Sequence, residues 1–393
     1  MNPPITAIEP TAPARLVTIP FVAVTGSMLL FFMYVGTALV AIPRFVEFEL
    51  GGGEIGIGLS IAAFSVAAVV ARPFIGRVSD RRGRRSVMTI GAVVAGAAGV
   101  LAGVAPNLAV FLLLRSLMGL GEAAIFVAAA TLVADLSPEG RIAEGASYLS
   151  VAVYTGIGLG PVLGEWILAG DRYQLVFIVS ACFAMAAAAA TRLVPPRVDR
   201  RSAANDERAP LFHRAALAPG LVLMCTLAAF SAFGAFIPEH ARSVGLSSAG
   251  GLFLVYSSTS LVLRIAAARL PNVIGAHPMV TVALSAMTVG MLLLALVPAV
   301  WALWVAAVVF GVAMAFNYPP LMAAVVESVP ERERASAVGS FTAFFEIGGI
   351  TGGLLLGTIA ELNGKRAGFA GAALIAMMGI AVLWTKLPRQ NRR

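Results

Sequence analysis

Three charged residues lie inside long apolar stretches, where charge is costly and therefore suggests chemistry. Arg115 and Glu122 interrupt one such stretch, and Glu346 interrupts another. A charged side chain at this depth must be paired, neutralised or exposed to water. Arg115 and Glu122 are seven residues apart, two helical turns, so we expect both to face a central cavity. Glu122 is predicted to exchange protons there, and Glu346 to bind a proton or a cationic group. The alternative is a structural pair for Arg115 and Glu122, and a hydrogen-bonded structural carboxyl for Glu346.

A glycine- and arginine-rich segment between two apolar stretches is the second candidate for a functional element. It is predicted to be a loop in which one glycine permits close helix packing and another a tight turn. Its aspartate can pair with arginine or accept hydrogen bonds at a helix N-terminus. Such a segment can hold two parts of a bundle together and release them. The residues concerned are Gly76, Asp80, Arg81, Gly83, Arg84 and Arg85.

A third pattern places glycines at four-residue spacing next to a proline, at Gly156, Gly160, Pro161 and Gly164. Small residues at this spacing let another helix approach closely, and the proline bends the helix. We expect this stretch to serve a specialised role in transport, and generic helix packing is the alternative.

Aromatic and polar residues in other apolar stretches are candidates for an apolar pocket. Phe230, Phe233 and Phe236 recur at three-residue spacing, and the double proline after Tyr318 predicts a break in a helix. The expected cavity residues are Tyr34, Phe233, Asn317 and Tyr318. Core or lipid contact is the alternative for the aromatics. Arg72 and Arg264 are expected to lie near a membrane face and to extend their guanidinium groups to water.

Composition identifies the elements that must position these residues. Of 393 residues, 59% are hydrophobic and only 12% charged, which excludes a soluble globular enzyme. The apolar runs are continuous, which favours helices over the alternating strands of a β-barrel. The expected spans are 17–42, 55–75, 86–105, 108–134, 144–168, 173–195, 216–238, 249–270, 278–298, 299–325, 335–360 and 367–387.

Basic residues predict the orientation of these spans. With both termini placed inside, the inner segments hold 20 of the 28 Lys and Arg residues and the outer loops hold 5. This asymmetry predicts that both termini are cytoplasmic. The net charge of +8 is therefore a topology signal, and no nucleic-acid partner is expected.

The two halves of the chain resemble each other. A shift of 192 residues superposes Arg72 on Arg264, Gly119 on Gly311 and Pro138 on Pro330. Six spans per half give a parallel repeat, whose halves can rock about a shared site. The predicted organisation is a tail at 1–16, a six-helix half at 17–195, a cytoplasmic linker at 196–215, a second half at 216–387 and a tail at 388–393. This duplication indicates transport.

Three of these segments resemble signatures of the major facilitator superfamily. Residues 76–85 match its pattern between helices 2 and 3, and Arg115 to Gly121 is similar to a pattern of proton-coupled members. Residues 156–164 resemble the signature of antiporters, although Ser147 and Glu165 depart from it. The chain thus resembles the twelve-helix drug/proton antiporter branch. The resemblance implies an all-α membrane protein of two pseudo-symmetric six-helix halves.

The predicted function is secondary transport of a small organic molecule, as proton-coupled efflux of drugs or metabolites. Proton-coupled uptake of a sugar or metabolite is the first alternative, and a non-transporting membrane sensor or scaffold the second. We expect no enzyme activity, no metal and no cofactor. The expected partners are a small-molecule substrate, protons and the lipid bilayer of a plasma membrane, in bacteria the inner membrane, with no oligomer required.

Overall fold

The computed structural model describes residues 15–138, 140–168, 172–195, 212–246 and 250–387. All regular secondary structure in these residues is helical. The expectation of an all-helical protein is therefore confirmed.

The N-terminal part of the described chain forms seven α-helices, of which α2 continues α1 through a short turn. Their bounds are α1 Ile19–Leu39, α2 Ala41–Arg44, α3 Gly53–Arg82, α4 Arg84–Ala102, α5 Leu108–Leu136, α6 Ile142–Leu168 and α7 Tyr173–Ala190.

The C-terminal part forms eight more. Their bounds are α8 Leu217–Ser243, α9 Gly250–Ala266, α10 Leu270–Ile274, α11 Ala276–Leu296, α12 Val300–Phe316, α13 Tyr318–Glu327, α14 Arg334–Asn363 and α15 Lys365–Lys386.

The helices have the length and surface of membrane spans. Within the described residues, 11 are long and apolar enough to cross a bilayer, and Gly251–Ala266 is a shorter apolar helix. Large apolar side chains cover the outside of the bundle, including Val70, Leu101, Trp166, Leu354 and Met378, each at least half exposed. Exposing these apolar side chains to water would be unfavourable, whereas contact with lipid tails is not. The surface therefore suits a membrane environment.

Two predicted details have different outcomes. The expected break at the double proline is confirmed, because α12 ends at Phe316 and α13 begins at Tyr318. The expected loop at residues 76–85 is wrong. Helix α3 continues through Arg82, and only Gly83 interrupts the helical path, with a φ of 88°. Arginine is a good helix former, whereas glycine adopts positive φ without a Cβ clash.

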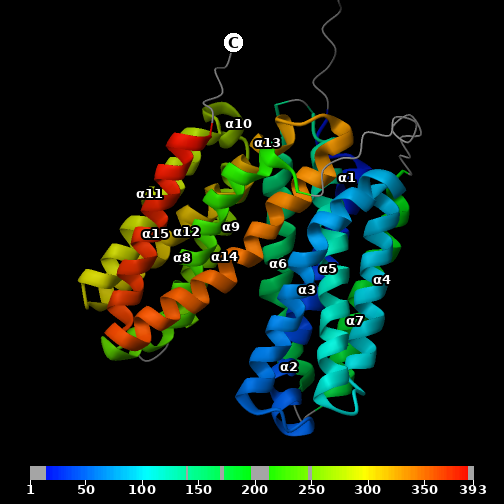
Figure 1. Ribbon diagram of the computed structural model, residues 1–393, viewed down its shortest axis with the longest axis horizontal. Helices are drawn as coiled ribbons and strands as arrows, with labels where there is room; N and C mark the ends of the chain where they lie inside the picture. The colour runs from blue at the N-terminus through cyan, green and yellow to red at the C-terminus, as the bar shows by residue number, and fades with distance from the viewer. Residues whose placement is uncertain (1–14, 139, 169–171, 196–211, 247–249, 388–393) are drawn as a thin grey trace, which may run out of the picture.

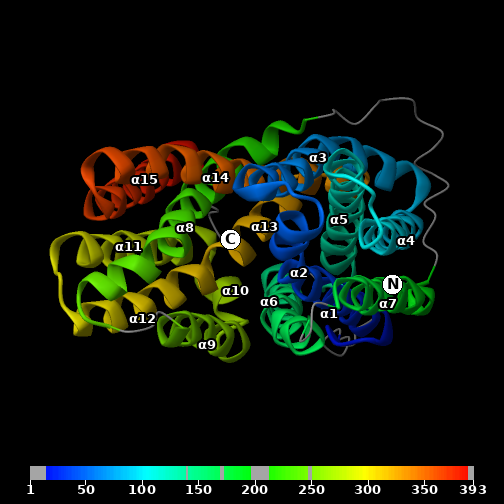
Figure 2. The ribbon, with the colours of Figure 1, turned by 90° about the horizontal axis from the view of Figure 1, so that it is seen from below.

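The helices form two bundles, α1–α7 and α8–α15 (Figures 1 and 2). Figure 1 shows the bundles close together at the end that carries α10 and α13, and diverging toward the other end. We call the first the basic end, because it carries Arg81, Arg84, Arg85 and Lys386. The contacts between bundles run through α3, α5 and α6 on one side and α9, α10, α13 and α14 on the other. The largest buried apolar cluster accordingly extends from the first bundle into α8 and α13.

Most of the predicted tail at 1–16, all of the tail at 388–393 and most of the linker at 196–215 lie outside the described residues. The end of the linker is described: the His213 amide donates to Ser340 Oγ of α14 at 2.9 Å. The predicted domain boundaries remain predictions.

Candidate functional site

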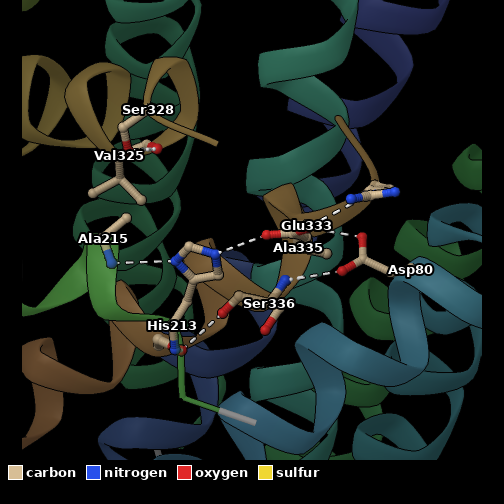
Figure 3. Close-up of polar contacts among 10 residues, drawn as sticks. Asp80, His213, Ala215, Val325, Ser328, Glu333, Ala335 and Ser336 are labelled. Atoms are coloured by element: carbon tan, nitrogen blue, oxygen red, sulfur yellow. Dashed lines mark hydrogen bonds and ion pairs between the residues drawn. The ribbon is translucent and has the colours of Figure 1, made fainter. Parts of the chain in front are cut away.

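Helix α3 contacts the start of α14 at the basic end. Asp80, in the last turns of α3, accepts hydrogen bonds from the backbone amides of Ala335 at 3.3 Å and Ser336 at 3.0 Å (Figure 3). These amides belong to the first turn of α14, where the helix has unsatisfied donors and a positive partial charge. A Cβ atom added at Gly76 would lie 2.8 Å from Ser336 Cα. The glycine thus permits the approach that these hydrogen bonds require.

Ion pairs surround this contact. Asp135 of α5 pairs with Arg84 and, at 3.0 Å, with Arg334 at the start of α14. On the other side of the basic end, Glu144 of α6 accepts from Arg269, which precedes α10, at 3.2 Å. The Arg334 and Arg269 pairs join residues of different bundles. The basic end is therefore held by charge as well as by packing.

A second polar cluster lies deeper, among helices α3, α5 and α14. Arg72 Nη2 donates to both carboxylate oxygens of Glu122, at 3.2 and 3.1 Å, and to Glu346 Oε1 at 3.3 Å. Its Nη1 donates to the backbone carbonyl oxygen of Thr342. Arg72 and Glu122 belong to the first bundle, and Thr342 and Glu346 to the second. One guanidinium thus joins the two bundles near the middle of the spans.

This cluster borders a cavity of about 200 Å³ between the bundles. Besides Arg72, Glu122 and Glu346, its wall is mainly aromatic and aliphatic. The aromatic side chains come from both bundles: Phe32, Phe64, Phe126, Tyr154, Tyr318 and Phe345. Arg72 and Glu122 are almost fully buried, whereas the Glu346 side chain is 20% exposed. Glu346 is thus the more accessible of the two acids.

Arg115 takes no part in this cluster. The expectation that it faces the cavity together with Glu122 is wrong, since it is not a lining residue and Glu122 pairs with Arg72 instead. Arg115 Nε donates to the Ser60 carbonyl oxygen at 3.3 Å, and its guanidinium lies 4.7 Å from the centre of the Phe64 ring. It therefore supports the cavity wall from behind Phe64.

Of the four expected cavity residues, the structure places only Tyr318 in the wall. Tyr34 is fully buried and donates to the Ala95 carbonyl oxygen at 2.8 Å. Phe233 stacks on Phe310 inside the second bundle, with ring centres 4.2 Å apart. Asn317 donates to Thr226 Oγ1. For these three, the alternative of packing within the bundle is what the structure shows.

The glycine-rich stretch of α6 packs against α1. A Cβ added at Gly156 would lie 2.7 Å from the Leu29 carbonyl oxygen, and one at Gly160 would lie 2.7 Å from Gly36 Cα. Gly164 and Pro161 also contact α1. The contact lies within the first bundle, so it fits the packing interpretation, and a role in antiport stays a prediction.

Arg72 is the central residue that sequence reasoning misjudged. The expectation that Arg72 and Arg264 reach water at a membrane face is wrong, because both are only 2% exposed. A signal was present: the repeat superposes the two arginines at matching positions of α3 and α9. A charge retained at equivalent depths of both halves indicates a role inside the bundle.

In the described part of the chain, no three His, Cys, Asp or Glu side chains lie together as metal ligands would. The site consists instead of an ion-paired cluster, an aromatic cavity and a contact between two bundles that ion pairs can stabilise or release. This arrangement suits a transporter.

Comparison with known proteins identifies the family. The pattern of the Major Facilitator Superfamily matches residues 24–298 and 220–393. The chain belongs to this family. It is therefore a multi-pass membrane protein for secondary transport, not an enzyme, and the superfamily resemblance is confirmed. The drug/proton antiporter branch stays a prediction.

Individual relatives support the same family. An uncharacterized MFS-type transporter of Pseudomonas aeruginosa is 28% identical over 98% of both chains. Multidrug resistance protein 2 of Bacillus subtilis is 27% identical over 43% of this chain and 42% of its own length. The solved structure of the E. coli fucose:proton symporter FucP has a TM-score of 0.79 at 15% identity, covering 94% of this chain and 99% of its own.

Proposed function

We propose that this transporter exports a small organic molecule in exchange for protons, by alternating access to the central cavity. The observation that carries the proposal is the Arg72 guanidinium, which joins Glu122 of one bundle to Glu346 of the other at the cavity wall. Protons that bind to these carboxylates act directly on a contact between the bundles.

Charge counting shows how coupling would work. One arginine faces two carboxylates, so the ionised cluster carries a formal charge of −1. A single proton, or one cationic group of a substrate, makes it neutral. Glu346 is the accessible acid, and its protonation removes the ion pair that links it to Arg72. In the described chain, Arg72 then joins the bundles only through the weaker hydrogen bond to the Thr342 carbonyl oxygen, whereas deprotonation restores the ionic attraction.

The basic end is proposed to face the cytoplasm, because Lys and Arg are concentrated there. Both termini would then be cytoplasmic, in the plasma membrane. The structure would correspond to a state whose cytoplasmic end is closed by Asp80, Asp135 and Glu144. Opening to the cytoplasm requires these contacts to break while the opposite ends approach, as in the rocking of two parallel repeats.

Export is favoured over uptake by two observations. The glycine-rich stretch at residues 156–164 resembles the antiporter signature, and a relative that matches part of the chain is a multidrug resistance protein. Uptake by symport is the competing function, and the structure of FucP shares the fold with this chain. The direction of coupled movement distinguishes the two.

The decisive experiment is transport in proteoliposomes with an imposed pH gradient, using a panel of organic cations, anions and neutral compounds. For at least one compound, we expect accumulation in the direction opposite to proton flow. Glu346→Gln and Glu122→Gln should lower gradient-driven accumulation at least tenfold while downhill exchange continues, because a glutamine cannot bind the coupling proton. Glu361→Gln, at an exposed glutamate of the same helix α14, is the matched control and should transport normally.

Two results would contradict the proposal. Accumulation in the same direction as proton flow would establish symport. Full gradient-driven transport by both glutamine variants would show that neither carboxylate couples protons to the substrate.

A further inference from the structure

The two repeat-related arginines, Arg72 and Arg264, have chemically different surroundings. Arg72 pairs with Glu122 of its own bundle and Glu346 of the other. Under the 192-residue shift, Glu122 corresponds to Met314 and Glu346 to Tyr154. These are the residues that Arg264 meets: its Nη2 donates to the Met314 carbonyl oxygen, and its guanidinium lies 4.7 Å from the centre of the Tyr154 ring. The neighbouring positions are repeated, but both acids are replaced, and Arg264 meets a backbone oxygen and an aromatic ring in their place.

Arg264 is consequently a buried cation that forms no ion pair within the described residues. It is 2% exposed, and its Nε donates to Ser260 Oγ at 3.3 Å. Its Nη1 is buried and, among these residues, has no hydrogen-bond partner. A buried charge of this kind is costly unless an opposite charge accompanies it. An anion is therefore the missing partner by charge.

A second unsatisfied donor lies close by. Tyr318 corresponds to Phe126 in the repeat, and Phe126 packs against Arg72 with its ring centre 5.3 Å from the guanidinium carbon. Tyr318 interacts electrostatically with both Arg72 and Arg264, and its hydroxyl is buried without a partner in the described chain. Both Tyr318 and Tyr154 line the central cavity. Arg264 does not itself line the cavity, but its guanidinium lies against the ring of Tyr154, which does.

We propose that Arg264 and Tyr318 form a binding site for a monovalent anion at the wall of the cavity. The anion would be the carboxylate group of an organic ligand or a free chloride ion, since both accept hydrogen bonds from a guanidinium and a phenol. The proposal deepens the proposed transport function by adding an anion site to the proton site. Its test is a binding measurement that requires no transport.

The test measures thermal unfolding of the purified full-length protein in detergent, at constant ionic strength in sodium sulfate. Sodium chloride, sodium benzoate and the neutral isostere benzamide are added in separate titrations. We expect chloride, benzoate or both to raise Tm by about 2 °C or more, increasing with concentration, because a ligand of the folded state stabilises it. Benzamide should have no effect. A response to chloride alone indicates an inorganic ion, and a stronger response to benzoate indicates an organic carboxylate.

Four variants assign the response to this site. Arg264→Gln should abolish it, and Arg264→Lys should retain part of it. Met314→Glu places a carboxylate at the position equivalent to Glu122, and this internal anion should also abolish the response. Met314→Gln, of the same size but neutral, should preserve it. If Arg264→Gln fails to fold, the two Met314 variants still decide the question.

The proposal is wrong if neither anion stabilises the protein, or if the response survives in both Arg264→Gln and Met314→Glu. These outcomes are separate from those of the transport assay. If the protein binds anions but Glu346→Gln transports normally, the proposal of proton coupling at Glu346 is contradicted and the anion site is not. If transport is coupled to protons but no anion stabilises the protein, the anion site is contradicted and the proposed transport function is not.

Discussion

At the scale of single residues, Arg72 has the most consequential position in the molecule. It is buried and contacts Glu122, Glu346 and the Thr342 carbonyl oxygen. A guanidinium has five N–H donors in a planar fork, so one side chain can serve three acceptor groups from two other helices, α5 and α14, at once. A lysine has a more compact charge and no such fork, so it could not replace Arg72 equally well.

Arg72→Gln is expected to destabilise the protein strongly. It leaves two carboxylates close together without a cation, and breaking a buried ion pair in this way costs about 3–5 kcal/mol. The double variant Arg72→Gln/Glu122→Gln removes one of these charges and should recover part of the lost Tm. Arg81→Gln, at an exposed arginine of the same helix, serves as the control and should change Tm little. Equal Tm values for Arg72→Gln and wild type would show that the cluster does not contribute to the stability of the fold.

At the scale of helices, the contact between α3 and α14 decides how closely the bundles approach at the basic end. Helix α3 delivers Asp80 to the α14 N-terminus because it continues without a break to Arg82. Gly76 lies one turn earlier on α3, where a Cβ atom would overlap the α14 backbone. Close packing and hydrogen bonding are thus supplied by the same helical segment.

Gly76→Ala is expected to weaken this contact. Its new Cβ would overlap the Ala335 and Ser336 backbone, which cannot move aside without shifting α14. The bundles should separate at the basic end. Double electron–electron resonance between spin labels at positions 81 and 332 should then show a distribution shifted to longer distances. Gly158→Ala is the matched control, because a Cβ there would meet no atom within 4 Å. An unchanged distribution in Gly76→Ala would refute the role of this glycine.

At the scale of the whole molecule, the described contacts place the two bundles in one asymmetric arrangement. Ion pairs involving Asp135 and Glu144 close the basic end, the Arg72 cluster joins the bundles further in, and the bundles diverge beyond it (Figure 1). Each inter-bundle ion pair must break for the opposite arrangement to form. Their summed strength therefore sets the population of the two states.

Asp135→Asn is expected to shift this population toward separation of the basic end. Asp135 pairs with both Arg84 and Arg334, and each 1.4 kcal/mol lost changes the equilibrium about tenfold. The same pair of spin labels would report a larger fraction of long distances. Arg334→Gln should act in the same direction. The shift in the double variant should be smaller than the sum of the two single shifts, because both substitutions remove the same ion pair. Strict additivity would mean that the pair does not act as a unit.

The sequence by itself determined the class of molecule and most of its elements. Continuous apolar runs predict spans, and the repeat and the signature at residues 76–85 predict the family, because hydropathy and motif spacing are properties of short stretches of chain. The break at Asn317 and the tight turn at Gly83 were also predictable, since proline and glycine act on the local backbone. The extension of α3 to Arg82 was not, because the same residues also suit a loop.

Only the tertiary structure decided which buried charges meet. Glu122 was predicted to function with Arg115, its neighbour along one helix, but it pairs with Arg72 of another helix, and Glu346 joins them from the second bundle. Likewise Tyr34, Phe233 and Asn317 have side chains suited to a pocket, but in the structure they point into the interiors of the bundles. The rotation of each helix about its axis depends on packing against all its neighbours. That information is distributed over residues hundreds of positions apart, so no local pattern contains it.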